Sequence, residues 1–237
     1  MNVLLLEPHQ HYRNDLYLVH ARQAEHIRRV LGLTVGDSLR AGLLNGPLGR
    51  AEVTVDDGTS LQIRFTPTGA PPPPPALKLV LALPRPKMLK RLLIDATSLG
   101  IKELHLINSY KVEKSFWSTP ELKSELLHSK LLLGLEQSGD TQLPQLHLAR
   151  RFKPFVEDIL PGVIAGHRAL LAHPGEAPPL PASVSDPICL AIGPEGGWTA
   201  YEVNALQDCG FAVHSFGPRI LRVETALPAL VGRLLPI

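Results

Sequence analysis

The residues best suited to chemistry follow an apolar stretch, residues 188–192, late in the chain. They form the glycine-rich segment 193–197, of sequence GPEGG, and Thr199 and Glu202 then make a capping-box pattern. This pattern predicts that the loop ends at a helix N-terminus, where backbone N–H groups are unpaired. A ligand can therefore approach bare backbone here, although the motif alone fits a purely structural turn equally well. It matches neither a dinucleotide fingerprint nor a P-loop, so we do not predict phosphate cradling.

A second loop with chemical potential spans residues 216–226, of sequence FGPRILRVETA. Arg219, Arg222 and Glu224 crowd this segment, and the alternative to a functional site is a solvated ion pair. If the strands before the two loops are parallel, both loops face one crevice beyond the strands' carboxyl ends. A final helix is expected to begin with Thr225 as its N-cap. Pro228 would then lie in the first turn of that helix, where its missing N–H costs no intrahelical hydrogen bond.

The elements that position these loops alternate between strands and helices. Apolar runs predict strands at 77–83, 103–107, 169–172, 188–192 and 212–216. Leucines at helical spacing predict one helix from Met88 to a stop at Gly100 and another from Pro120 to near Gly139. This alternation predicts an α/β fold with a mainly parallel sheet covered on both faces.

The first part of the chain has a different pattern. Short strands are predicted at 39–44, 50–55 and 61–65, separated by Asn-Gly and Asp-Gly turn signals, with one basic helix over 24–31. Five prolines, 71–75, then form a stiff spacer. We therefore expect a small β-barrel domain over 1–70, a linker over 71–76 and an α/β domain over 77–237.

Composition excludes several classes of protein. The 237 residues are 44% apolar and 19% charged, which rules out a disordered chain. A net charge of +2 is too small for the protein as a whole to attract a polyanion such as RNA, so any RNA-binding site must be a local patch of cations. Cations exceed anions between residues 76 and 160. Cys189 and Cys209 form no CxxC motif, which favours a reducing cytoplasm, and neither a membrane segment nor a zinc ligand set is predicted.

Residues 192–197 (IGPEGG) together with 216–226 resemble the paired signature of the RsmE family, bacterial 16S rRNA uridine-N3 methyltransferases. Residues 26–33, Gly36-Asp37 and 44–46 are similar to the RNA-binding part of that family, and 96–100 and 136–139 match its middle segment. The resemblance covers nearly the whole chain, because these patterns occur in the family's order and spacing. Ser98 and Asp140 depart from the residues common in the family, glutamate and arginine, and leave RNA contact and dimer packing open.

The resemblance implies a SPOUT-type α/β domain with a C-terminal trefoil knot, preceded by a PUA-like RNA-binding barrel, in a cytoplasmic homodimer without metal. It also implies S-adenosylmethionine as methyl donor and 16S rRNA in the 30S subunit as partner. The implied donor-binding residues are Leu171, His173, Gly193, Pro194, Glu195, Gly196, Gly197, Phe216, Gly217, Pro218, Ile220, Leu221, Arg222, Glu224, Thr225 and Ala226.

Methylation of uracil N3 requires in-line positioning and loss of the N3 proton. An arginine beside the uracil carbonyls would stabilise the resulting anion, with Arg222 as first candidate and Arg219 as second. Glu195 or Glu224 is a candidate proton acceptor, and holding loop N–H groups is the competing role for Glu195. The cations expected to contact RNA phosphates are Arg22, Arg28, Arg29, Lys87, Lys90 and Arg91.

Two alternatives stay open. One is another SPOUT methyltransferase, acting on a tRNA base or a ribose hydroxyl. The other is a non-catalytic RNA-binding assembly protein, which the intact glycines of both loops disfavour.

Overall fold

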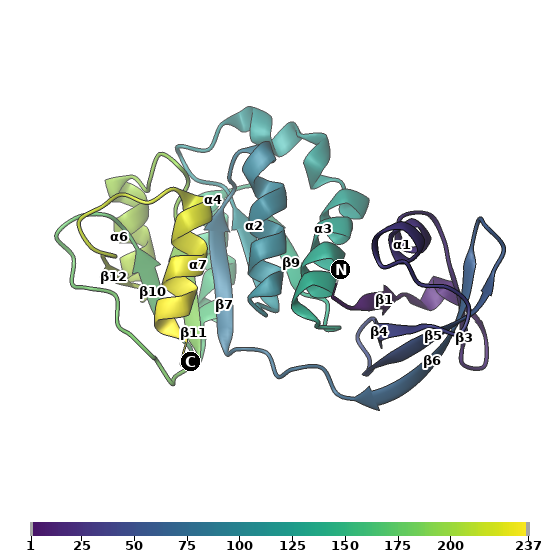
Figure 1. The fold of residues 1–237 in the computed structure, drawn as a ribbon. Helices are drawn as coiled ribbons and strands as arrows, with labels where there is room; N and C mark the ends of the chain where they lie inside the picture. Colours follow the sequence, from purple (N-terminus) through teal and green to yellow (C-terminus); the bar gives the residue numbers. More distant parts are fainter. Residues whose placement is uncertain (1, 236–237) are drawn as a thin grey trace. The chain divides into compact units, whose positions relative to one another are not determined.

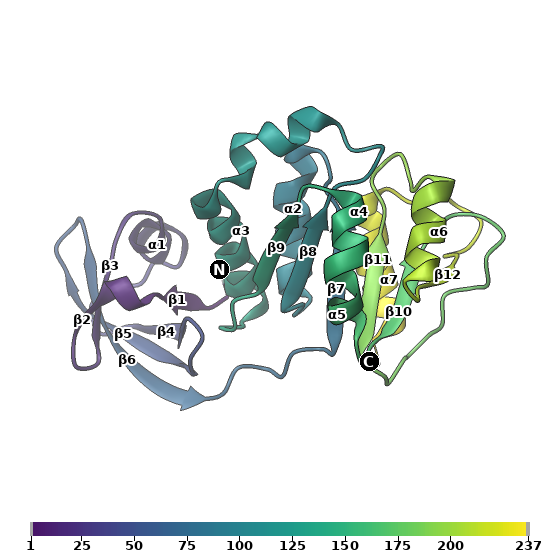
Figure 2. The same ribbon diagram turned by 180° about the vertical axis from the view of Figure 1, so that it is seen from behind.

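The computed structural model describes residues 2–235, and these form two compact units (Figures 1 and 2). The first unit contains the chain up to Pro73 together with Leu132–Leu143. The second contains Pro74–Leu131 and the chain from Pro144 onward. The proline run therefore lies at the change from one unit to the other, and a later helical segment returns to the first unit.

The first unit is built on a six-stranded sheet in the order β1-β4-β5-β6-β3-β2. Its strands are β1 (Leu4–Leu6), β2 (His11–Arg13), β3 (Leu16–Val19), β4 (Ser38–Leu43), β5 (Leu48–Asp56) and β6 (Leu61–Gly69). All neighbouring pairs are antiparallel except β1 with β4. Alternate residues of β5 and β6 are buried, as expected when one face of a sheet covers a core.

The turns of this sheet explain its register. Asn45 has a φ of 59° and Gly58 a φ of 86°, so both predicted turn signals provide the left-handed conformation that tight hairpins need. β6 extends beyond the predicted Phe65 because Thr66 and Pro67 still pair with β5. Pro67 lies there without breaking the sheet.

Short helical segments complete the first unit: η1 (Pro8–Gln10), α1 (Ala21–Glu25) and the π-helical turn η2 (His26–Val30). The predicted basic helix over 24–31 is thus two consecutive turns of different type. Ala24 and Ile27 are fully buried and pack into the core of the sheet, so the cationic side chains of the helical segment lie on its other faces.

The end of α3 (Ser124–Ser138) belongs to the first unit and carries a buried carboxylate. Leu135 packs against Val3 and Leu5, and the next residue, Glu136, is only 2% exposed. Both oxygens of Glu136 accept hydrogen bonds from the Arg22 guanidinium, at 2.9 and 2.8 Å. This bidentate pair ties α1 to the end of α3.

Replacing Arg22 with alanine is expected to lower the free energy of unfolding by about 2–3 kcal/mol, because the buried Glu136 carboxylate then keeps, among residues 2–235, only the longer hydrogen bond from Gln23 Nε2, at 3.3 Å. Arg29→Ala is the matched control: its partner Glu25 is exposed, and such pairs contribute about 0.5 kcal/mol or less. Urea denaturation of both variants measures the difference. Equal losses would show that Glu136 needs no cation.

The second unit contains a six-stranded sheet in the order β12-β10-β11-β7-β8-β9, and every neighbouring pair is parallel. Its strands are β7 (Leu77–Ala82), β8 (Glu103–Ile107), β9 (Gln145–Ala149), β10 (Arg168–Ala172), β11 (Ile188–Ile192) and β12 (Ala212–His214). β11 is buried along its whole length, as a central strand covered on both faces must be. The prediction of a parallel α/β sheet is confirmed.

The remaining helices cover both faces of this sheet. They are α2 (Pro86–Ser98), η3 (Lys114–Ser118), η4 (Pro120–Leu122), α4 (Phe152–Pro154), η5 (Phe155–Ile159), α5 (Leu160–Ile164), α6 (Ala200–Asp208) and α7 (Val223–Leu234). Figure 1 shows α2 and α7 side by side on one face, and Figure 2 shows α4, α5 and α6 on the other.

Two helix boundaries differ from prediction. Pro120 begins a short 3-10 turn, and the long helix α3 starts only at Ser124. The last helix begins at Val223 with Arg222 as N-cap, so Thr225 is not the cap and Pro228 lies inside the helix. The Thr225 and Ala226 N–H groups already bond to the Arg222 carbonyl, which sets the earlier start.

Among residues 2–235, no helix has the length and apolarity needed to span a membrane.

Candidate functional site

A cavity of about 670 Å³ lies at the carboxyl ends of β10, β11 and β12. Because these three strands are neighbours and parallel, their following loops meet at one edge of the sheet. The prediction that the 193–197 and 216–226 loops face one crevice is confirmed. We call this space the main cavity, and its lining residues are Arg85, Lys111, Ala172, His173, Pro174, Ile192, Gly193, Pro194, Glu195, Gly196, Gly197, Trp198, Phe216, Gly217, Arg219, Ile220, Leu221, Arg222, Val223, Glu224, Ala226 and Leu230.

Most residues expected at the donor site lie on this lining, and three do not. Leu171 is fully buried within β10, one residue before the strand's end. Pro218 and Thr225 belong to the lining loops without lining the cavity themselves. For these three, the structure offers no side-chain contact with a ligand in the main cavity.

The loop 193–197 is held by contacts from neighbouring strand ends. Arg85, which follows β7, donates to Glu195 Oε1 from both its backbone N and its Nε at 3.2 Å. Lys111, which follows β8, donates from Nζ to the Gly196 carbonyl at 2.7 Å. The predicted capping box is present, with Thr199 and Glu202 exchanging hydrogen bonds at the start of α6. The loop is therefore fixed at both ends.

Glycine is required at position 193 for space. A Cβ atom built there would lie 3.0 Å from Nε1 and 3.1 Å from Cδ1 of Trp198. Trp198 is 4% exposed and packs against Phe152, with ring centroids 6.3 Å apart, so the indole has little room to withdraw. The cavity wall at this point consists of backbone facing an indole ring.

Two buried polar atoms on the lining have no hydrogen-bond partner among the described residues. They are Nδ1 of His173 and Nε1 of Trp198. Burial, and secondarily the nearby Lys111 ammonium, lowers the pKa of His173, so its imidazole is neutral at neutral pH. A ligand that supplies hydrogen-bonding groups to the main cavity would satisfy both atoms, since orphaned buried polar groups are rare in folded proteins.

The loop between β12 and α7 supplies cations. Arg219 and Arg222 are exposed at the cavity, and neither forms an ion pair with any described residue. Arg222 is the N-cap of α7 by its backbone alone, since its side chain makes no capping hydrogen bond. The alternative interpretation of a solvated pair with Glu224 does not hold here. Both guanidinium groups are available to a ligand.

Arg85 and Lys111 are lining residues that the sequence did not single out. Arg85 and Lys111 do carry a signal, because each follows a predicted parallel strand by only a few residues. In a parallel sheet such residues collect at the same edge as the two loops. The ion pair between Arg85 and Glu195 favours the role of Glu195 in fixing the loop.

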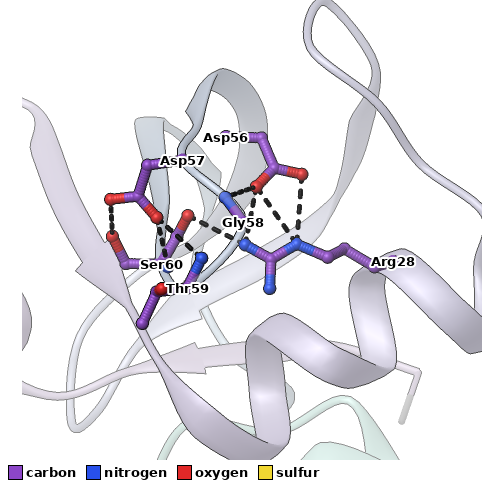
Figure 3. Close-up of polar contacts among 6 residues, drawn as sticks. All are labelled: Arg28, Asp56, Asp57, Gly58, Thr59 and Ser60. Carbon is purple, nitrogen blue, oxygen red and sulfur yellow. Dashed lines mark hydrogen bonds and ion pairs between the residues drawn. The ribbon is translucent and has the colours of Figure 1, made fainter.

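Most cations expected to contact RNA have intramolecular partners. Figure 3 shows Arg28 donating to both oxygens of Asp56 and to the Ser60 carbonyl. In the same turn, hydrogen bonds lower the pKa of Asp57 to about 2. The largest contribution comes from the Ser60 N–H, followed by the Ser60 hydroxyl and the Thr59 N–H. Arg28 therefore braces a hairpin. The other pairs are Arg22–Glu136, Arg29–Glu25, Lys90–Glu121 and Arg91–Asp95, and no ion pair is found for Lys87 within residues 2–235.

One cluster in the second unit has metal-ligand types: Glu103, His105 and His147, with ligand atoms within 4.8 Å of one another. The carboxylate of this cluster already has two partners. Glu103 accepts from His105 at 2.9 Å and pairs with Lys78 at 3.2 Å. An ammonium group beside the carboxylate opposes a second cation, so we assign no metal to this cluster.

Comparison with known proteins decides the family. A model of an RNA methyltransferase domain matches residues 71–235. Ribosomal RNA small subunit methyltransferase E of Treponema pallidum is 32% identical over 214 residues, covering 85% of this chain and 77% of that protein. The chain belongs to the ribosomal RNA small subunit methyltransferase E family. The namesake of Synechocystis is 28% identical and covers 94% of this chain and 73% of that protein.

Solved structures agree with the family in their fold. Ribosomal RNA small subunit methyltransferase E from Neisseria gonorrhoeae, bound to S-adenosyl methionine, has a TM-score of 0.76. It is 19% identical, and the match covers 98% of this chain and 95% of that one. A Legionella pneumophila methyltransferase in complex with the same cofactor has a TM-score of 0.73 at 20% identity, covering 98% and 95%. The predicted membership in the methyltransferase E family is confirmed.

Proposed function

We propose that this methyltransferase E family member transfers a methyl group from S-adenosylmethionine to N3 of a uridine in the decoding region of 16S rRNA, in assembling 30S subunits. The observation that carries the proposal is the main cavity, where two glycine-containing loops meet beside unpaired arginines. The family supports the rRNA methyltransferase activity, and the chemistry of the lining supports the choice of reaction.

The lining fits the methyl donor. A volume of about 670 Å³ lies within the usual range of small-molecule sites. Trp198 Nε1 offers a donor to the polar edges of an adenosine group, and His173 Nδ1 offers an acceptor or a donor according to its tautomer. When bound, S-adenosylmethionine supplies a methyl group on a positively charged sulfur. Gly193 permits the ligand to lie against the backbone of the loop.

Arg222 and Arg219 are proposed to bind the two carbonyl oxygens of uracil. N3 becomes a nucleophile only when its proton leaves, and negative charge then spreads onto those oxygens. A guanidinium beside them lowers the pKa of N3 and stabilises the charge as it develops, an effect worth about 3 kcal/mol per well-placed donor. Because neither arginine pairs with a carboxylate among residues 2–235, uracil can bind without first breaking an ion pair.

Glu195 is proposed to position the loop. Its Oε1 accepts two hydrogen bonds from Arg85, which tie the loop to the residue that follows β7. A proton acceptor must be free to bind the proton it removes, so Glu224, which lines the cavity, remains the better carboxylate for that step.

The architecture of the family is proposed for both units. Residues 1–70 would form a PUA-like RNA-binding domain and 77–237 a SPOUT domain, joined by the linker 71–76. A trefoil knot is supported by contacts at the end of α7: the N–H groups of Ser183 and Val184 bond to the carbonyls of Arg233 and Leu234. The segment between β10 and β11 therefore crosses the last turn of the chain's final helix. We also propose a cytoplasmic homodimer, consistent with two free cysteines.

Methyl transfer to isolated 30S subunits tests the function directly. With labelled S-adenosylmethionine, label is expected in 30S subunits lacking the modification and absent from bulk tRNA, and nucleoside analysis should identify N3-methyluridine. Label in tRNA would favour another SPOUT activity. No calorimetric binding of the donor at about 1 mM, where most cofactor sites are saturated, would favour a non-catalytic assembly protein.

A further inference from the structure

A second cavity, of about 510 Å³, lies beside the main cavity in the second unit. Its floor contains Asn108 and Ser109, which follow β8, and its walls carry Tyr110, Phe152 and Tyr201, with Lys153 at its edge. The elements that contribute, β8, α4 and α6, reach the same edge of the sheet as the methyl donor loops (Figure 2).

The aromatic side chains of this cavity are unusually exposed. Tyr110 is 85% exposed and Tyr201 61%, although burial of such rings is normally favourable. The Phe152 ring lies 6.4 Å from that of Tyr201 and 6.3 Å from that of Trp198. Because Trp198 lines the main cavity, one pair of packed rings separates the two spaces.

The floor offers unused hydrogen-bonding groups. Ser109 is 1% exposed, and its hydroxyl has no hydrogen-bond partner among residues 2–235. Asn108 Oδ1 accepts from Trp117 Nε1 at 2.8 Å, which fixes the amide so that its Nδ2 donor group remains available. A buried hydroxyl without a partner costs free energy in the unbound protein, and a bound ligand with polar edges would recover that cost.

The cavity is preformed. Glu202, 1% exposed, accepts the Tyr110 N–H on Oε1 at 2.7 Å and the Thr199 N–H on Oε2 at 2.8 Å. One carboxylate thus holds the β8 loop and the start of α6 at a set separation. Among the described residues that line this cavity, Glu202 is the only acidic one, and its hydrogen bonds occupy it. The cation at the edge is Lys153, which forms an exposed ion pair with Glu157 at 3.6 Å, and such a pair is weak enough for a ligand to displace.

We propose that the second cavity binds an unstacked nucleobase of the RNA substrate, next to the nucleotide whose base enters the main cavity. Single-stranded bases are held by stacking on aromatic rings and by hydrogen bonds to their edges, and this cavity provides both next to a cation. The inference rests on the proposed function because it places the substrate across both cavities.

The test uses the full chain with two probes: a single-stranded oligouridylate carrying 4-thiouridine for crosslinking, and 30S subunits for methylation. Crosslinks are expected in residues 108–110 and 199–201. Tyr201→Ala should weaken oligouridylate binding about tenfold, whereas Tyr201→Phe, which keeps the ring, should stay within about twofold. Ile159→Ala, which removes an exposed apolar side chain outside the cavity, serves as the control.

Ser109→Ala separates a ligand role from a structural one. It should leave thermal stability unchanged or slightly higher, since it removes an unpartnered hydroxyl, while it weakens RNA binding. Lower stability with unchanged RNA affinity would contradict the proposal. An unchanged KM for 30S subunits in Tyr201→Ala would also contradict it. If Tyr201→Ala instead alters the oligomeric state while RNA binding stays normal, the proposal is wrong and the occupant of the cavity is a second copy of the chain.

Failure of this inference differs from failure of the proposed function. Calorimetry with S-adenosylmethionine should give the same affinity for Tyr201→Ala as for the unmodified protein. If the protein methylates no RNA but crosslinking still maps to the second cavity, the cavity assignment stands and the reaction is wrong. If 30S subunits are methylated and crosslinks map elsewhere, the reaction stands and the cavity assignment is wrong.

Discussion

Gly193→Val is expected to abolish binding of S-adenosylmethionine. The affinity should fall by at least about 100-fold, which is a loss of roughly 2.7 kcal/mol of binding free energy. The first side-chain carbon would stand 3.0 Å from Trp198 Nε1, and two further methyl groups must then enter the same wall. The indole is buried and packed on Phe152, so the loop backbone has to move instead. Isothermal calorimetry measures the loss.

The matched control is Gly162→Val in α5, where an added Cβ meets nothing within 4 Å. The same substitution in the same unit should leave donor affinity unchanged. Thermal unfolding without ligand shows whether Gly193→Val still folds, and Gly193→Ala gives a milder variant in which Trp198 need shift by only a few tenths of an ångström. Normal affinity in Gly193→Val would contradict the assignment of this loop to the donor.

The position of the main cavity was predictable because it follows from topology. Parallel strands bring their carboxyl ends to one edge, so two loops separated by about twenty residues of sequence were expected together. The capping box at Thr199 needed only local spacing. These features depend on short-range chemistry and on a rule that holds for all open parallel sheets.

The partners of charged side chains were not predictable in the same way. Arg22 pairs with Glu136, which is 114 positions away in sequence, and Arg28 pairs with Asp56 on a hairpin. Neither separation has a helical or strand period, so no local pattern connects them. The basic segment alone therefore predicts a phosphate-binding surface, whereas all three of its arginines pair with carboxylates of their own unit.

The missed elements have a similar cause. Strand β9 alternates polar with apolar residues at the edge of the sheet, and the helical region from Phe152 to Ile164 contains two prolines and a π-helical turn, which obscure its periodicity. The return of Leu132–Leu143 to the first unit depends on Leu135 packing against Val3 and Leu5. Such tertiary contacts override the simple rule that a linker separates everything before it from everything after it.

Arg222→Ala is expected to keep the fold while methyl transfer to 30S subunits slows by more than tenfold. Within residues 2–235 the side chain makes no capping bond and no ion pair, so its removal disturbs neither α7 nor the loop. What is lost is a positive charge beside the uracil carbonyl oxygens, and each such donor contributes about 3 kcal/mol to a developing anion. Single-turnover rates with saturating donor measure the effect.

The dependence of the rate on pH distinguishes this role from simple RNA attraction. Without the guanidinium the pKa of uracil N3 stays higher, so the deficit of Arg222→Ala should shrink as pH rises and deprotonates the base without help. Arg168→Ala is the control, because Arg168 is an exposed arginine at the end of β10 that lies away from the cavity. This variant should change neither the rate nor its pH profile. A uniform deficit at every pH, relieved by raising the 30S concentration, would assign Arg222 to RNA binding and leave Arg219 as the arginine that meets the charge on the base.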